Sequence, residues 1–392
     1  MSDNNFIPYA RQSISPEDIE EVRQTLTQPM ITRGPKVEEF EQAFAQYCGC
    51  NYAVSFNSGS TALMAAYFAA NLDKNDRILS TPNTFVATVG SGMQFNATPV
   101  FVDIDRSTGN MSLEQLFLNL NHPHSRGKTV VVPVHFAGIP VDMQTIDTHI
   151  ADIDTVVIED AAHAVGSHYK DGSKVGSCNW SHMTVFSFHP AKTITTGEGG
   201  MVTTNDEQLW HRLQIFRNNG IERNAPYLQG TAAPGYYEVT ALTSNYHLTD
   251  IQAALGLSQL KRLDTFVSAR QKLMHTYRQE LASLKNVRLF IDPEDQHIAH
   301  HLCVVQIDFQ AYKTSRTAVM EALKQRGIGT QVHYIPLYRH PVFANPAGDL
   351  SEYFPETEAY YSQALSLPLY ADLTYDEVRS IVKALKAALQ AK

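Results

Sequence analysis

The stretch "TVFSFHPAKTITTGEGGMVTTND", residues 184–206, holds two of the apolar runs from which we infer the fold. The first run, 184–188, is rich in apolar residues and stops at His189, and the second begins at Met201. The turn between them is rich in Thr and Gly residues and carries one lysine, Lys192. Two buried strands joined by a polar turn fit this pattern. A solvated loop lysine remains the simpler interpretation of Lys192 when the stretch is taken alone.

The same pattern repeats between about residue 50 and residue 205. Short apolar runs alternate there with segments of helical spacing such as 61–70. The seven runs cover residues 52–56, 77–80, 99–104, 129–135, 155–158, 184–188 and 201–203. Buried strands that alternate with helices predict the α/β class, with a mostly parallel, seven-stranded sheet flanked by helices.

The pattern changes after residue 250. A long helical segment is expected at 250–284, followed by strands near 301–309 and 329–334 and a last helix that opens with a capping box at Thr374. We therefore predict a large α/β domain at 1–250 and a smaller C-terminal α+β domain at 251–392. The first residues, up to about residue 12, are expected to pack on the small domain.

Composition excludes several function classes. The net charge of -9 over 392 residues argues against a nucleic-acid partner, because no basic stripe is present to neutralise phosphates. No apolar stretch reaches the length of a membrane span, so no membrane partner is expected. The cysteines and histidines lack zinc-site spacing, which predicts no metal. We expect a cytoplasmic protein whose four cysteines are reduced thiols.

Candidate binding residues follow the first predicted strand, in "NSGSTALMAA". Gly59 permits a tight turn, Ser60 and Thr61 supply hydroxyls, and a helix begins there. A helix N-terminus with free N–H groups and small residues can bind a phosphate. The alternative is an ordinary Ser/Thr helix cap.

Three further candidates belong to the same edge of the sheet. Asp160 lies at or just past the end of a buried strand, where a carboxylate is costly unless a cation pairs with it; it could instead cap the next helix. Lys192 follows another strand, and burial there would lower its pKa and free its amine. Phe85, in "PNTFVAT", offers either a flat face for a ring or ordinary core packing.

One ligand accounts for these features together. Pyridoxal 5′-phosphate carries a phosphate for Ser60, a ring for Phe85, a basic ring nitrogen for Asp160 and an aldehyde for Lys192. The cofactor acts as an electron sink, which is deepest when a carboxylate keeps the ring nitrogen protonated. The Gly/Thr turn would leave Lys192 free to bind the aldehyde, to be displaced by substrate and to return as a base.

Several motifs make the chain resemble the DegT/DnrJ/EryC/StrS nucleotide-sugar aminotransferases, which are fold-type I pyridoxal-phosphate enzymes. The resemblance extends over nearly the whole chain. The motifs are "TRGPKVEEFE" (32–41), "NSGSTAL" (57–63), "PNTFVAT" (82–88), "HFAGIPVDM" (135–143), "IEDAAHAVGS" (158–167), "FSFHPAKTITTGEGGMVTTND" (186–206), "NYHLTDIQAALGLSQL" (245–260) and "GIGTQVHYIPLY" (327–338).

The resemblance implies roles for individual residues. Lys192 would be catalytic, joined to the cofactor aldehyde and moving the proton of the amino donor. Asp160 would bind the ring nitrogen, His163 would lie near the phenolic oxygen, and Phe85 would stack on the ring. The phosphate would be held by Gly59, Ser60 and Ser187, with Thr61 as an alternative to Ser60 because "SGST" departs from the usual spacing. Asn245 would reach the phosphate in a partner subunit, which implies a homodimer; it could also be a polar turn residue.

Within the family the likeness is greatest to the 4-aminotransferases of pseudaminic acid biosynthesis. It implies transfer of an amino group from L-glutamate to C4 of a UDP-linked 4-keto-2-acetamido-2,6-dideoxy hexose. Candidates for contacts to the sugar nucleotide are Thr32, Arg33, Gly34, His333 and Tyr334, which could equally be ordinary loop and strand residues. Two departures are His247, where arginine is frequent, and the insert at 224–239.

Three other functions are alternatives to this one. A 4-aminotransferase acting on a D-configured sugar, of the bacillosamine or perosamine type, is the nearest. A sugar dehydratase shares the fold but typically has histidine where this chain has Lys192. A non-catalytic sugar-nucleotide-binding regulator is opposed by the intact Lys192, Asp160 and phosphate turn.

Overall fold

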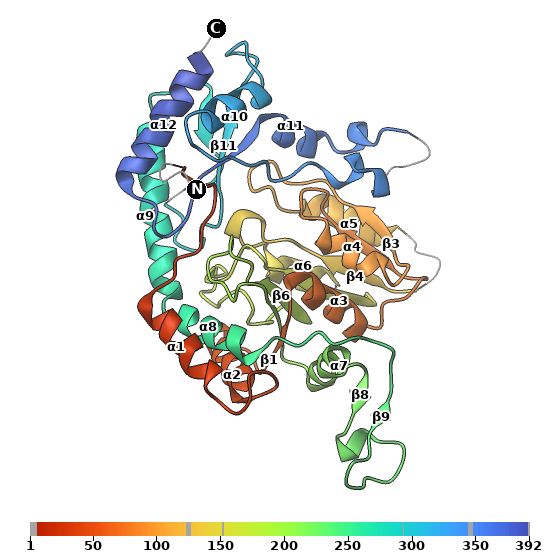
Figure 1. Ribbon diagram of the computed structural model, residues 1–392. Coiled ribbons are helices and arrows are strands. Elements are labelled where there is room, and N and C mark those ends of the chain that lie inside the picture. The colour runs from red at the N-terminus through yellow and green to blue at the C-terminus, as the bar shows by residue number, and fades with distance from the viewer. Residues whose placement is uncertain (1–5, 123–126, 151–152, 293, 344–347, 391–392) are drawn as a thin grey trace.

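The structure is a computed structural model that describes residues 6–122, 127–150, 153–292, 294–343 and 348–390. Its centre is a seven-stranded sheet in the order β1-β7-β6-β5-β4-β2-β3 (Figure 1). The strands are β1 (Tyr52–Phe56), β2 (Arg77–Ser80), β3 (Thr98–Phe101), β4 (Thr129–Val132), β5 (Thr155–Asp160), β6 (Met183–Ser187) and β7 (Gly200–Thr204). Only β7 runs antiparallel to its neighbours β1 and β6.

Helices cover both faces of this sheet because its strands are apolar on both sides. In β4, Val130 and Val132 pack with α3 (Gly59–Ala69) and α7 (Glu207–Arg217), near α4 (Ala87–Met93). Val131 points to the opposite face, which is covered by α2 (Pro35–Cys48), α5 (Leu113–Asn121) and α6 (Met143–Ile150). The near-continuous apolar runs of the sequence thus match a sheet buried on both faces.

A second sheet lies in the C-terminal part of the chain. Its antiparallel strands are β10 (Val287–Leu289), β11 (Cys303–Ile307) and β12 (Ala364–Leu367). They share a separate core with α9 (Leu263–Leu281), α10 (Arg316–Lys324) and α12 (Tyr375–Gln390), while α11 (Pro355–Gln363) precedes β12. The N-terminal segment joins this part, since Ile7 pairs with Ile328. Helix α1 (Pro16–Leu26) packs against α8 (Asp250–Lys261).

A hairpin arm extends away from the body of the molecule. It consists of β8 (Ile221–Glu222), β9 (Glu238–Val239) and the loop between them, and it contains the whole insert noted in the sequence (Figure 1, green). Exposed apolar side chains line it: Tyr227, Tyr236, Tyr237 and Val239.

The expected α/β class and the seven strands are confirmed, with boundaries shifted by a few residues. The prediction of a strand at 329–334 is wrong. That segment makes a single bridge, between Gln331 and Ser366. Beyond that bridge the backbone no longer pairs with β12, and the N–H of Tyr334 donates to the Asn83 side chain at 3.3 Å.

The helical segment expected at 250–284 is two helices, α8 and α9, that meet at Arg262. None of the described helices is long and apolar enough to cross a bilayer.

Candidate active site

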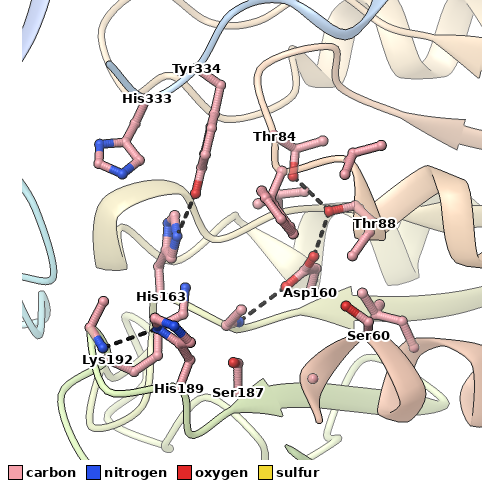
Figure 2. A pocket seen from close by; sticks show the side chains of 18 of the residues that line it. Ser60, Thr84, Thr88, Asp160, His163, Ser187, His189, Lys192, His333 and Tyr334 are labelled. Atoms are coloured by element: carbon pink, nitrogen blue, oxygen red, sulfur yellow. Dashed lines mark hydrogen bonds between the residues drawn. The ribbon is translucent and has the colours of Figure 1, made fainter. Parts of the chain in front are cut away.

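A pocket of about 780 Å³ lies beyond the carboxyl ends of β5 and β6 (Figure 2). Parallel α/β sheets bind ligands at this edge, because the strand ends and the following loops converge there. Nine of the candidate residues line the pocket: Gly59, Ser60, Phe85, Asp160, His163, Ser187, Lys192, His333 and Tyr334. The structure therefore brings together side chains from four separate strand ends and from the C-terminal part of the chain.

Asp160 is the last residue of β5 and is only 5% exposed. Its Oδ2 accepts a hydrogen bond from Thr88 Oγ1 at 2.7 Å, and its Oδ1 accepts one from the Ala162 N–H at 3.1 Å. Thr88 has one hydroxyl hydrogen, which goes to the carboxylate, so the 2.7 Å contact with Thr84 is donated by Thr84. Two hydrogen bonds thus fix the carboxylate at the floor of the pocket.

Asp160 also lacks a cationic partner in the described part of the chain, since none of the ion pairs found there includes it. A buried carboxylate without a cation is costly. A protonated ring nitrogen placed in the pocket would supply the missing charge. This feature fits the expected pyridoxal phosphate.

Lys192 lies in the loop between β6 and β7 and extends into the pocket (Figure 2). Burial lowers the pKa of Lys192 to about 8, although the negative charge of Asp160 opposes the shift. At pH 7 about a tenth of the side chain is therefore the free amine, which is the form that attacks an aldehyde.

The loop that carries Lys192 is more firmly held than its Thr and Gly residues led us to expect. Thr195 Oγ1 donates to the Phe188 carbonyl at 2.8 Å and accepts from the Gly197 N–H at 2.9 Å. Thr196 Oγ1 donates to the Glu198 carbonyl at 2.8 Å. The threonine hydroxyls thus pin the backbone, and the freedom that Lys192 needs resides in the rotatable bonds of its own side chain.

The N-terminus of α3 forms another wall of the pocket. Ser58 caps the helix, because its Oγ accepts from the Thr61 N–H at 3.1 Å. Thr61 Oγ1 lies 2.8 Å from the same Ser58 Oγ, and Thr61 does not line the pocket, whereas Ser60 does. A Cβ added to Gly59 would lie 2.8 Å from the Cβ of Ser187. The small residues therefore leave room for an anion at the unpaired N–H groups of the helix start.

Phe85 stands beside the pocket with 57% of its surface exposed, although it is a large apolar side chain. Its ring lies 6.4 Å, centroid to centroid, from that of Tyr334. An exposed aromatic face at the mouth of a cavity is available for a flat ligand to stack on.

Histidines form the opposite side of the pocket. Burial lowers the pKa of His163 well below its usual range, with a further contribution from the charge of Lys192. Burial likewise lowers the pKa of His333 to about 3, and His333 Nδ1 lies 2.8 Å from Ser366 Oγ. Both rings are therefore neutral around pH 7.

Four candidates lie away from the pocket of their own chain. The backbone of Thr32 pairs with Thr249, and the N–H of Gly34 donates to Asp250 Oδ2 at 2.7 Å. Arg33 is exposed between them. Asn245 is exposed and pairs with Asn218. All four lie around the start of α8, and none of them lines the pocket.

Sequence reasoning did not single out several residues of the site. These are Tyr9, Thr88, His189, Glu198 and His301, all of which line the pocket. Thr88 lies in the motif at 82–88, and His189 and Glu198 lie in the motif at 186–206, so membership of these motifs is the signal that marks them. Nothing local marks Tyr9 or His301, because tertiary packing alone brings them to the pocket. Among the described residues, no group of His, Cys, Asp and Glu could hold a metal ion.

Comparison with known proteins gives matches over nearly the full length. The chain matches the DegT/DnrJ/EryC1/StrS aminotransferase family over residues 12–386. It is 38% identical over 388 residues to the uncharacterized protein MJ1066 of Methanocaldococcus jannaschii, covering 98% of each chain. It is 36% identical over 385 residues to the spore coat polysaccharide biosynthesis protein SpsC of Bacillus subtilis, covering 98% of this chain and 97% of SpsC.

Solved structures also match over nearly the full length of the chain. Helicobacter pylori PseC, an aminotransferase involved in the biosynthesis of pseudaminic acid, has a TM-score of 0.87, 28% identity and coverage of 98% of this chain and 99% of its own. The PLP form of the putative sugar aminotransferase Spr1654 from Streptococcus pneumoniae also has a TM-score of 0.87, with 26% identity and the same coverage. DesI, solved with its TDP-sugar product, has a TM-score of 0.85 and 27% identity, and covers 99% of this chain and 94% of DesI.

Proposed function

Because this chain belongs to the DegT/DnrJ/EryC1/StrS aminotransferase family, we propose that the pocket transfers an amino group from L-glutamate to C4 of a UDP-linked 4-keto sugar. The protein is a sugar aminotransferase, and its cofactor is pyridoxal 5′-phosphate. The sugar that we propose is a 4-keto-2-acetamido-2,6-dideoxy hexose, and the product is UDP-4-amino-4,6-dideoxy-N-acetyl-β-L-altrosamine, an intermediate of pseudaminic acid synthesis. The likeness to PseC supports this choice.

A single observation carries the chemistry: an amine of lowered pKa, Lys192, and an unpaired buried carboxylate, Asp160, face one pocket. When bound there, pyridoxal phosphate supplies an electron sink and a carrier for the amino group. Asp160 would hold the ring nitrogen in its protonated form, with Thr88 fixing the direction of the carboxylate.

Each remaining residue would have a binding or proton-transfer role. Lys192 would bind the cofactor aldehyde at rest. Once displaced by the amino donor, Lys192 would act as a general base and remove the proton from Cα of that donor. Gly59, Ser60 and Ser187 would bind the phosphate at the start of α3. Phe85 would stack on the ring. In the second half of the reaction Lys192 would return a proton to C4 of the sugar.

The substrates and the cofactor phosphate are anions, yet Lys192 is the one Lys or Arg side chain among the described residues that line the pocket. We infer that a second copy of the chain completes the site. Thr32, Arg33, Gly34 and Asn245 would then serve the pocket of the partner subunit, with Asn245 near its phosphate. The exposed aromatic residues of the hairpin arm would be covered in the same dimer.

The same pocket could process a D-configured sugar, and the likeness to DesI shows that related proteins act on other nucleotide sugars. A single-turnover experiment separates the two. The protein is first converted to its amino form with glutamate, freed of excess donor, and mixed with the 4-keto UDP-sugar in the L-arabino or the D-xylo form. Recovery of the starting absorbance with the L-arabino sugar alone is expected. Recovery with the D-xylo sugar alone would overturn the pseudaminic acid assignment and leave the aminotransferase chemistry intact.

A further inference from the structure

His163 makes hydrogen bonds through both of its ring nitrogens. The backbone N–H of Ala137 donates to Nδ1 at 3.3 Å, and Nε2 lies 2.9 Å from the hydroxyl oxygen of Tyr334 (Figure 2). His163 is 6% exposed and belongs to the segment that follows β5, whereas Tyr334 lies 171 residues further along the chain. The second contact therefore joins the large sheet to the C-terminal part of the molecule.

The first contact decides where the imidazole proton is. A backbone N–H can only donate, so Nδ1 must be the unprotonated nitrogen. A neutral imidazole then carries its single hydrogen on Nε2. Since burial and nearby positive charge both keep the pKa of His163 low, the neutral form is the one present. His163 therefore donates to Tyr334, and not the reverse.

Tyr334 consequently keeps its own hydroxyl hydrogen for another partner. The Nε2–H of His163 points at the phenol oxygen from 2.9 Å and occupies one side of it. The phenol hydrogen cannot share that direction with another donor hydrogen, so it points away from His163. In the described part of the chain, His163 is the only hydrogen-bond partner of this hydroxyl, and Tyr334 lines the pocket.

The surrounding structure holds Tyr334 in place. Its backbone N–H donates to Asn83 Oδ1 at 3.3 Å, and the hydroxyl of Tyr360 donates to the preceding carbonyl, that of His333, at 2.7 Å. Its ring also packs at the edge of Phe136, with centroids 6.3 Å apart. Burial raises the pKa of Tyr334, so the phenol retains its proton at working pH.

We propose that Tyr334 is a fixed hydrogen-bond donor to an oxygen atom bound in the pocket, and that His163 is the positioning residue that directs it. The acceptor is an oxygen of the cofactor, its phenolic group, or an oxygen of the substrate on its reacting carbon. The proton stays on Tyr334 throughout, so no bond to it is broken. This role differs from the direct contact between His163 and the phenolic oxygen that the sequence led us to expect, because Tyr334 occupies the Nε2–H.

The direction of the hydrogen bond can be tested without activity. In the cofactor-loaded protein labelled with ¹⁵N-histidine, long-range ¹H–¹⁵N correlation distinguishes the two neutral tautomers of a histidine from its cation. His163 is assigned by loss of its signals in His163→Gln. We expect the hydrogen on Nε2 in the wild type and in Tyr334→Phe, because Ala137 fixes the tautomer in both. A hydrogen on Nδ1, or a cationic ring at neutral pH, would overturn the proposal.

Tyr334→Phe then identifies the acceptor, with Tyr338→Phe as the matched control. Tyr338 donates to Glu358 at 2.7 Å and lies outside the pocket lining, so its loss should leave the site unchanged. If the acceptor is on the cofactor, Tyr334→Phe shifts the pH titration of the cofactor absorbance in the substrate-free protein. If it is on the substrate, that titration is unchanged and the single-turnover rate of the amino form with the 4-keto sugar falls about 10- to 100-fold. If Tyr334→Phe produces neither of these changes, the proposal is overturned.

A pair of His163 variants separates positioning from packing. His163→Gln offers an amide that can accept from Ala137 and donate to Tyr334, so it should retain most of the effect of the donor, whereas His163→Leu should resemble Tyr334→Phe. Equal behaviour of the two variants would contradict the positioning role. The kinetic measurements rest on the proposed substrates, whereas the NMR measurement does not, so failure of the proposed function is distinguishable from failure of the role of Tyr334.

Discussion

Lys192 owes its chemistry to its surroundings more than to its neighbours in the sequence. The lysine would be an ordinary loop cation if the strand ends did not bury it. Burial lowers its pKa to about 8, against a usual value of about 10.4. The fraction of Lys192 present as the free amine increases as the pH rises and reaches one half near pH 8.

The rate at which cofactor-free protein binds pyridoxal phosphate should follow this titration. We expect the rate to rise about tenfold per pH unit below pH 8 and to level off above it, because only the uncharged amine attacks the aldehyde. Stopped-flow absorbance over a pH series measures it. A rate that keeps rising beyond pH 10 would mean that the lysine has its ordinary pKa.

Thr88 should matter to catalysis through Asp160. Thr88→Val keeps the shape of the side chain and removes the hydrogen bond to the carboxylate, whose loss is worth about 1.5–3 kcal/mol for a charged acceptor. We expect kcat to fall about 10- to 100-fold. Thr155→Val is the control, since the Thr155 hydroxyl is buried and unpaired at the far end of the same strand. Equal activity of the two variants would contradict the role of Thr88.

The sequence predicts some site residues and not others for a physical reason. Lys192, Asp160 and Ser60 each follow an apolar run, so a parallel sheet brings them to one edge whatever the rest of the chain does. Tyr9 and His301 reach the pocket only because the N-terminal segment and the C-terminal part pack together over it. Likewise, no periodicity places Tyr334 against His163.

At the scale of elements, apolar runs identify strands but not their direction. All seven strands follow from β-branched runs, whereas the antiparallel course of β7 depends on the short loop that carries Lys192. The segment 329–334 has the composition of a strand and forms none, because only Gln331 bridges to β12 and the Tyr334 N–H donates to the Asn83 side chain instead. Local composition therefore fails where the chain passes over the site.

Helix α3 needs glycine at its first residue. Gly59→Ala would place a Cβ 2.8 Å from the Cβ of Ser187, which requires a shift of the helix start; such overpacking costs about 1–3 kcal/mol. We expect weaker binding of pyridoxal phosphate, by roughly tenfold or more, measured as Kd of the cofactor-free protein.

Gly90→Ala in α4 is the matched control for this substitution. Its added Cβ meets only Val86, at an ordinary 3.6 Å, and Gly90 does not line the pocket. It should leave the cofactor Kd unchanged and raise stability slightly, as Ala favours helices over Gly by about 1 kcal/mol. Equal cofactor Kd values for Gly59→Ala and wild type would show that the helix start is not a tight phosphate site.

At the scale of the whole molecule, the inferred dimer predicts complementation between two inactive variants. Lys192→Ala removes the amine, and Asn245→Asp places a negative charge where we propose that Asn245 meets the partner's phosphate. When the two are unfolded together and refolded, half of the dimers are hybrids, and each hybrid has one intact site. Activity should therefore return to about a quarter of the wild-type value.

The outcome depends on which pocket Asn245 serves. If Asn245 acted on the pocket of its own chain, every site in the hybrid would carry one defect and no activity would return. Sedimentation of each variant alone checks that both remain dimers. A monomeric wild-type protein would also contradict the shared site.

The most direct test of the account is to find the lysine that binds the cofactor. The protein loaded with pyridoxal phosphate is treated with borohydride, which makes the bond to the lysine permanent, and is then digested and mapped by mass spectrometry. We predict a single modified peptide, with the label on Lys192, and none after prior conversion to the amino form with glutamate. Label on another lysine, or cofactor released unattached, would contradict the assignment of this pocket as the active site.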